Sequence, residues 1–211
     1  MTLLQMDGKI LLSTAYLPPL DYFLLIAGAD KIFIEKEENY IKQTWRNRCR
    51  ILSSNGPLTL TVPVKKGDSL KNPVSSVMID YTKRWQQVHL RAILSSYGSA
   101  PWFQFYFERF EEIILSGEEF LIDLNHNLLR TIMDLLGIKT QIEYTGFFDP
   151  VSVAGNDYRY TIRPGKTPFF KTREYIQVFS YKSGFVPGLS IIDLLFNLGP
   201  ESLKFLRSRI Q

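Results

Sequence analysis

Residues 9–35 have the sequence KILLSTAYLPPLDYFLLIAGADKIFIE, and this stretch decides the fold class. Its first six residues predict a short buried strand, because the run is mostly apolar and too short for a helix. The Pro18-Pro19 pair fixes the backbone and ends that strand. Asp21 to Ala27 predicts a helix that ends at Gly28, and residues 31–35 predict a second strand. This order indicates a βαβ unit, so we expect an α/β fold with a mixed sheet.

Such a unit also predicts where a ligand binds. In open α/β sheets, ligands lie at the carboxyl ends of the strands. That rule places residues 13–16 close to residues 35–40, because both segments directly follow a predicted strand. We therefore expect the two segments to meet at a site.

Residues 42–50, KQTWRNRCR, carry four cations within nine positions. If the segment is extended, its side chains alternate between two faces. Five side chains then share one face: Lys42, Thr44, Arg46, Arg48 and Arg50. A row of cations on a strand needs water or an anion beside it, and guanidinium groups match phosphate and carboxylate geometry, so one interpretation is an anion site. The alternative is a solvated edge strand whose charges oppose aggregation.

The rest of the chain predicts a hairpin followed by a layer of helices. Asn55-Gly56 separates the strand-like residues 46–51 and 58–64, which is a strong hairpin signal. Apolar side chains recur at helical spacing from Trp85 to Leu136, so we expect a helical layer over that range. Further expected elements are a capping box at residues 116–119 that opens the third helix, strands at 77–81, 141–145 and 175–181, a long irregular loop at 149–168, and helices that begin at Ser190 and Pro200.

The composition favours a packed globular protein of 211 residues, with 45% hydrophobic and 14% aromatic residues. The net charge is +4, and the first hundred residues carry 13 Lys and Arg against 8 Asp and Glu. This balance favours a small anionic ligand and disfavours a nucleic-acid track. No apolar run approaches ~20 residues and no signal-peptide pattern opens the chain, so we expect a cytoplasmic protein without a membrane span. We expect residues 1–211 to form a single domain.

Several catalytic motifs are missing from the sequence. It contains no G-x-x-x-x-G-K-[ST] phosphate loop, no G-x-G-x-x-G fingerprint and no G-x-S-x-G elbow. With two His and one Cys, the chain can form no intramolecular disulfide and no cysteine-based zinc site, and no cofactor or metal is expected. His89 can move a proton near neutral pH, although a lone histidine is more often part of the core. Cys49 is expected to be buried and inert, because the arginines beside it point to the opposite strand face.

An ordered set of motifs extends over nearly the whole chain. It comprises residues 16–23, Ala29-Asp30, 38–49, 60–64, Asp80-Tyr81, Trp85, His89, Ala92-Ile93, Tyr97, Pro101, Asp157, Arg159, 177–179 and 189–197. The set resembles the WbqC-like protein family. That resemblance implies a connection with bacterial O-antigen gene clusters, and some relatives are labelled as aminoacyl or glycyl transferases. Many members carry His-Gln-Pro just before the aromatic-proline turn, where this chain has Ser13-Thr14-Ala15, so chemistry that depends on that histidine does not carry over.

The resemblance and the row of cations together lead to a functional hypothesis. We expect a transferase that acts on an activated, phosphate-bearing substrate such as a nucleotide sugar, in bacterial surface-polysaccharide synthesis. Lys42 and Arg48 would hold phosphate, Asn47 would orient the substrate, and His89 would be the general base. Four further residues are candidates for substrate contacts: Tyr16, Tyr22, Asp157 and Arg159. The alternative is a non-catalytic binding or assembly protein that uses a basic, aromatic surface.

Overall fold

A parallel sheet begins the fold, as the sequence predicts. β1 (Ile10–Ser13) pairs in parallel with β2 (Lys31–Glu35), and α1 (Leu20–Ile26) lies between them in the chain. β5 (Gln141–Tyr144) pairs in parallel with the other side of β2, which gives the strand order β1-β2-β5. The α/β class and the βαβ start are therefore confirmed. The computed structural model describes residues 10–65, 72–150 and 156–208.

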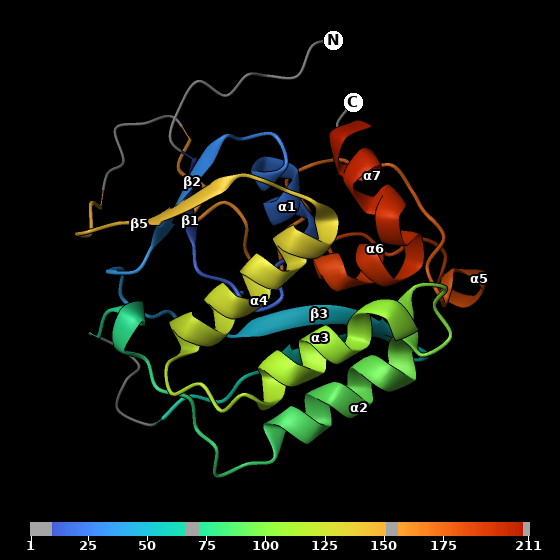
Figure 1. The fold of residues 1–211 in the computed structure, drawn as a ribbon, viewed down its shortest axis with the longest axis horizontal. Helices are drawn as coiled ribbons and strands as arrows, with labels where there is room; N and C mark the ends of the chain where they lie inside the picture. Colours follow the sequence, from blue (N-terminus) through green and yellow to red (C-terminus); the bar gives the residue numbers. More distant parts are fainter. Residues whose placement is uncertain (1–9, 66–71, 151–155, 209–211) are drawn as a thin grey trace.

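The predicted hairpin forms a second, antiparallel sheet. β3 (Arg48–Ser53) pairs with β4 (Gly56–Thr61) across the two-residue turn Ser54-Asn55. Gly56 has a φ of 100°, a backbone conformation that glycine adopts without a steric cost. Among the described strands, the parallel and antiparallel pairs thus lie in separate sheets (Figure 1).

β3, the first strand of the hairpin, begins at Arg48, whereas the predicted alternation of side chains requires an extended backbone from residue 42. Residues 42–47 form turns and bends, and Gln43 has a positive φ of 62°. Arg46 and Asn47 are neighbours in the sequence, yet both are buried, at 3% and 6% exposure. The predicted alternation is therefore wrong before Arg48, because a turn interrupts the extended backbone.

Three helices form the predicted layer in the middle of the chain. They are α2 (Trp85–Tyr97), α3 (Phe103–Leu115) and α4 (Leu121–Leu136). Gly137 ends α4 with a φ of 69°, as expected for a glycine at this position. The predicted capping box at residues 116–119 is wrong, because Phe120 is extended and forms a bridge with Met78, so the helix cannot begin earlier.

Shorter helices complete the fold. α6 (Ile191–Leu198) begins as predicted at Ser190, whose hydroxyl accepts a hydrogen bond from the Ile192 N–H. The remaining helical elements are η1 (Val74–Ser76), α5 (Ser180–Ser183), η2 (Gly199–Glu201) and α7 (Ser202–Ser208). None of the described helices combines the length and the hydropathy that crossing a bilayer needs.

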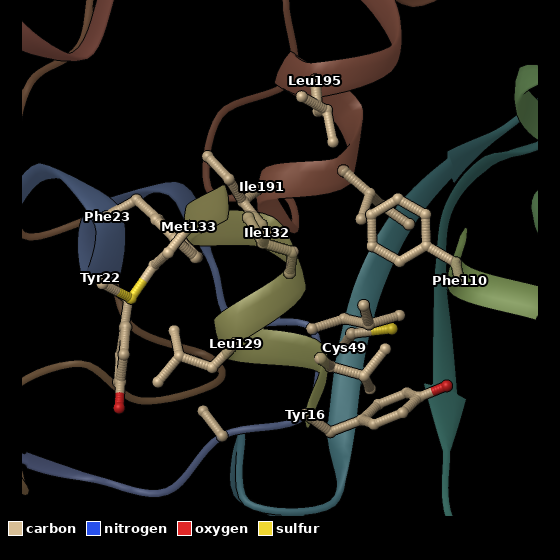
Figure 2. Close-up of a cluster of buried hydrophobic side chains, with 14 of the residues drawn as sticks. Tyr16, Tyr22, Phe23, Cys49, Phe110, Leu129, Ile132, Met133, Ile191 and Leu195 are labelled. Carbon is tan, nitrogen blue, oxygen red and sulfur yellow. The ribbon is translucent and has the colours of Figure 1, made fainter. Parts of the chain in front are cut away.

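The core gathers around α4. Figure 2 shows Leu129, Ile132 and Met133 of α4 between Phe23 of α1 and Cys49 of β3. All five side chains are at most 5% exposed. Burial raises the pKa of the Cys49 thiol, so this cysteine is a small core residue, as predicted, rather than a nucleophile.

Two predicted strands do not form. Residues 77–81 make only isolated bridges to other segments. The predicted strand at 175–181 is wrong, because the segment has no ladder partner within residues 10–65, 72–150 and 156–208, and its end belongs to α5. The side chain of Gln177 instead donates to the Val186 carbonyl (3.0 Å) and accepts from the Val186 N–H (2.9 Å). Side-chain hydrogen bonds thus replace the ladder that the pattern predicts.

The predicted loop at residues 149–168 is irregular from residue 156 onward, and residues 151–155 lie outside the described part of the chain. Its Asp157 forms a single parallel bridge with Leu11 of β1. Two backbone hydrogen bonds hold this contact, from the Leu11 N–H to the Asn156 carbonyl (3.0 Å) and from the Tyr158 N–H to the Leu11 carbonyl (2.9 Å). The loop is thereby fixed beside the end of β1.

Candidate functional site

A cavity lies at the carboxyl end of β1, and we name it the strand-end cavity. It is lined by residues 12–15 and 44–46, by Tyr22 of α1, and by four residues of the segment 158–163. Its empty volume is about 340 Å³, open solvent at its mouth included. The position follows the rule for open α/β sheets.

Arg46 forms a buried ion pair at one side of this cavity. Its Nε donates to Glu38 Oε1 (3.0 Å) and its Nη2 donates to Glu38 Oε2 (2.5 Å). The two side chains are only 4% and 1% exposed. Arg46 Nη2 also donates to the hydroxyl of Ser13 (2.9 Å), and Nη1 donates to that of Thr44 (3.2 Å). All three nitrogens of the guanidinium are thus engaged, and Arg46 holds two hydroxyl groups of the cavity wall in place.

Arg159 occupies a matching position on the other side. Its Nε (3.0 Å) and Nη2 (2.6 Å) donate hydrogen bonds to the Asp157 carboxylate, and its Nη1 donates to Glu35 Oε2 (3.2 Å). The side chain of Arg159 has no exposed surface. Hydrogen bonding to Asp157 raises the pKa of the guanidinium above its ordinary value. The Ser13 hydroxyl donates to the Arg159 carbonyl (3.3 Å). Ser13 is also the partner of Glu35 in the parallel pairing, so the ends of β1 and β2 meet here, as the sequence predicts.

A second cavity adjoins the first, and we name it the loop cavity because residues 161–169 form much of its wall. It has an empty volume of about 380 Å³, open solvent included. Three residues, Trp45, Ile162 and Arg163, line both cavities. A ligand that is longer than one cavity can therefore extend into the other.

The loop cavity carries cations without carboxylate partners. Arg50, Arg163 and Lys166 line it, and within the described residues none of the three forms an ion pair. The Arg163 guanidinium lies over the ring of Tyr160, 5.0 Å from its centroid, which leaves its charge uncompensated. The lining contains one carboxylate, that of Asp21. Three positive charges against one negative charge make this cavity suited to an anion.

Asp21 tethers the loop to α1. It is 5% exposed, and its Oδ2 accepts a hydrogen bond from the Phe169 N–H (2.7 Å). Burial raises the pKa of this carboxyl group, while the N–H groups of Phe169 and Phe170 oppose the shift. The bond holds the segment that carries Arg163 and Lys166 in place over the cavity.

Tyr16 and His89 form a pair outside both cavities. The Tyr16 hydroxyl lies 2.9 Å from His89 Nδ1, and His89 Nε2 lies 3.2 Å from the Thr61 carbonyl. Since the carbonyl can only accept, Nε2 carries the proton and Nδ1 accepts from Tyr16. Burial lowers the pKa of His89 to about 4, so the ring is neutral near pH 7. His89 is 2% exposed and lines neither cavity, which is the arrangement of a satisfied core histidine.

The other predicted site residues fall into two groups. Tyr22 and Arg159 line the strand-end cavity, and Asp157 binds Arg159. The Tyr22 hydroxyl is committed to the Ser13 carbonyl (2.8 Å). The second group lines neither cavity: Lys42 is exposed, Asn47 is buried and donates to the Val62 carbonyl (2.8 Å), and Arg48 is half-buried.

Metal ligands do not gather in the described part of the chain, where no group of three or more His, Cys, Asp and Glu side chains is placed to hold an ion. The carboxylates nearest to the strand-end cavity, Glu35, Glu38 and Asp157, are bound to the two arginines. The polar chemistry on offer is therefore that of hydroxyl groups and cations.

Comparison with known proteins agrees with the resemblance noted in the sequence. The model of the WbqC-like protein family matches residues 14–154 and 159–205. The chain belongs to the WbqC-like protein family. It is 29% identical over 240 residues to an uncharacterised protein of Mycobacterium tuberculosis, Rv1507c, in an alignment that covers 96% of this chain and 98% of that protein. No solved structure matches this WbqC-like chain.

Ser13 lies in the segment 13–16 that the sequence places at the site, whereas three residues of the candidate site were not predicted to contact a ligand: Arg50, Arg163 and Lys166. Arg50 belongs to the predicted row of cations, but no pattern distinguishes it from Arg48. Arg163 and Lys166 lie in the predicted long loop, and the length of that loop was the available signal.

Proposed function

We propose that this WbqC-like protein is a transferase that binds a phosphate-bearing, nucleotide-sugar-like substrate in the two adjoining cavities and acts in bacterial surface-polysaccharide synthesis. The observation that carries the proposal is a set of three cations that line the loop cavity and form no ion pair in the part of the chain that the structure describes: Arg50, Arg163 and Lys166. Cations that share a cavity repel one another, and a phosphate group relieves this repulsion.

The geometry supports different roles for different parts of the site. The loop cavity would hold the phosphate group, and its cations would stabilise the negative charge that a leaving phosphate gains during group transfer. Trp45 lies in the wall between the cavities and offers an aromatic surface to the bound molecule. The proposal gives no role to His89, because both of its ring nitrogens are engaged in the core.

Calorimetric titration with UDP-glucose tests the binding part. Arg50→Met and Lys166→Met should each weaken binding about 10-fold or more, because each removes a charge-assisted contact of about 1.5–3 kcal/mol. Lys42→Met is the matched control, since Lys42 is exposed and lines neither cavity. Equal affinity of the unaltered protein and the three variants would exclude the loop cavity as the phosphate-binding site.

Release of UDP and glucose from UDP-glucose, with water as the acceptor of the glucosyl group, tests the transferase part. We expect a rate above that of buffer alone, and a lower rate in Arg50→Met. Binding of UDP-glucose without any release of UDP would contradict transfer to water and would favour the non-catalytic alternative.

The non-catalytic alternative has a weaker observation behind it. Ile176 and Tyr181 are 81% and 84% exposed and could contact a protein partner. We rank this interpretation second, because single exposed apolar side chains are common on protein surfaces and do not by themselves indicate a partner.

A further inference from the structure

Four aromatic side chains line the two cavities: Tyr22 and Tyr158 in the strand-end cavity, Phe169 in the loop cavity, and Trp45 in both. Three of them already pack against another ring. Tyr158 meets Phe169 edge to face, with 5.7 Å between the ring centroids, and Tyr22 lies 6.3 Å from Phe23. Among the residues that the structure describes, the Trp45 indole has no ring partner.

The other two tryptophans of the chain differ from Trp45 in their surroundings. Trp85 is 4% exposed and meets His89 edge to face (5.1 Å), and Trp102 stacks on Tyr106 (6.5 Å). Neither tryptophan lines the strand-end cavity or the loop cavity. Trp45 is half-buried, packs against the core and also lines both cavities. Its indole is thus supported from the interior and still has apolar surface that a ligand can bury.

The backbone around Trp45 is fixed before a ligand binds. The Trp45 carbonyl accepts a hydrogen bond from the Tyr16 N–H (2.8 Å). The next residue, Arg46, is held by its ion pair with Glu38 and donates to the hydroxyl of the preceding residue, Thr44 (3.2 Å). Because the residues on both sides of Trp45 are joined to each other, little ordering of this segment is needed on binding.

Cations lie close to the indole in the same walls. Arg163 lines both cavities together with Trp45, and Arg50 and Lys166 line the loop cavity. A phosphate held by these cations occupies a cavity that Trp45 also lines, so the group joined to that phosphate can reach the indole. A nucleobase offers a π-face, on which indole and guanidinium groups both stack. A sugar ring has no π-face, so this part of the site favours a flat aromatic group.

We propose that Trp45 is the stacking residue for the nucleobase of the ligand, while the cations of the loop cavity hold its phosphates. This inference rests on the proposed function and adds the class of the ligand, which is a nucleotide rather than a sugar phosphate that lacks a base. Stacking selects for the presence of a base and tolerates any base, since every base has a π-face.

Calorimetric titration with UDP and inorganic pyrophosphate tests the contribution of the base. UDP should bind about 5-fold or more tightly than pyrophosphate, because it alone has a base to stack. Trp45→Leu keeps an apolar side chain but no ring, so it should remove this advantage and leave the affinity for pyrophosphate unchanged. Equal affinity for the two ligands in the unaltered protein would overturn the inference. So would a loss of pyrophosphate affinity in Trp45→Leu as large as the loss of UDP affinity.

Glucose 1-phosphate distinguishes a stacked base from a stacked sugar, because it carries a sugar and a phosphate but no base. Its affinity should be the same in the unaltered protein and in Trp45→Leu. An affinity for glucose 1-phosphate that falls as much as that for UDP would contradict stacking of the base.

Tryptophan fluorescence gives a second readout, which does not depend on the folding of Trp45→Leu. UDP should quench the emission of the unaltered protein, because the base contacts the Trp45 indole. Trp45→Phe should abolish this quench and keep the UDP affinity within about 3-fold, since a phenyl ring also stacks. Trp102→Phe is the matched control and should keep the quench, because Trp102 lines neither cavity.

Failure of the inference and failure of the proposed function give different results. A quench that persists in Trp45→Phe, together with normal binding of UDP, would overturn the role of Trp45 and leave the phosphate site in place. Absence of both UDP and pyrophosphate binding in the unaltered protein would remove the proposed function and the inference with it.

Discussion

The strand-end cavity and the loop cavity adjoin, yet their arginines differ in what surrounds them. Arg46 is paired with Glu38 and is almost inaccessible, whereas Arg50, four positions later, has no carboxylate partner among the described residues. The comparison teaches that a cation-rich segment can serve the fold and the ligand at the same time. Burial and pairing, rather than residue type, separate the two roles.

The most direct test of this comparison removes one arginine from each cavity. Arg46→Met should lower the free energy of unfolding by about 3–5 kcal/mol, because the Glu38 carboxylate would stay buried without its partner. Arg50→Met should lower it by less than about 1 kcal/mol, because no partner is left behind. Urea unfolding of the two variants measures the difference.

A double variant is the control for this prediction. Arg46→Met combined with Glu38→Leu should recover much of the lost stability, because the uncompensated charge is removed as well. An Arg46→Met protein as stable as Arg50→Met would show that the buried pair contributes no more than the open cation.

His89 extends the comparison to a buried polar group that carries no charge. Its pKa is lowered to about 4 in the folded protein, below the ordinary value of 6.5, so the unfolded chain binds the proton more readily. The stability that the neutral ring allows is thus complete above pH 6.5 and is lost as the pH falls toward 4. The loss should reach about 3 kcal/mol.

Unfolding free energies measured from pH 7 to pH 4 check this value. The His89→Gln variant serves as the reference, because an amide can keep both hydrogen bonds but does not titrate. Parallel pH curves for the two proteins would contradict the burial of a neutral His89.

Asp21 tests the same comparison in the loop cavity, and its substitution is expected to change stability the least. Because burial raises the pKa of this carboxyl group, its ionised form costs stability near pH 7, and the cost disappears as the pH falls and the group is protonated. Asp21→Asn should therefore raise the free energy of unfolding at pH 7 by less than about 1 kcal/mol, since the amide oxygen still accepts from Phe169.

The same variant should bind UDP a few-fold more tightly at low salt, because it removes the one negative charge from the cavity lining. Asp21→Ala, which loses the acceptor for the Phe169 N–H, should instead be destabilised. A loss of UDP affinity in Asp21→Asn would indicate that the carboxylate itself contacts the ligand.

Much of the fold follows from the sequence because it depends on local pattern. The βαβ start, the hairpin and the helical layer are all set by apolar spacing and by turn residues. The errors arise where a distant contact outweighs that pattern. Phe120 pairs with Met78 and delays α4, and Gln177 bonds to Val186 in place of forming a strand.

The place of the site was predictable, but most of its residues were not. The ends of β1 and β2 meet as the general rule requires, so Ser13 and Glu35 lie close to the same arginine. Which cations remain unpaired is decided by tertiary structure. Arg159 is paired with a carboxylate 124 positions earlier, while Arg50 is left open, and no local pattern contains that information.

The pairing of Glu35 with Arg159 also has a consequence for synthesis on the ribosome. Glu35 has no exposed surface in the finished protein, and its partner is translated 124 residues later. Until that arginine leaves the exit tunnel, the nascent βαβ unit carries a carboxylate that it cannot bury at low cost. Completion of this end of the sheet is therefore a late step in the folding of the nascent chain, and a nascent fragment that stops before Arg159 should remain exposed to chaperones.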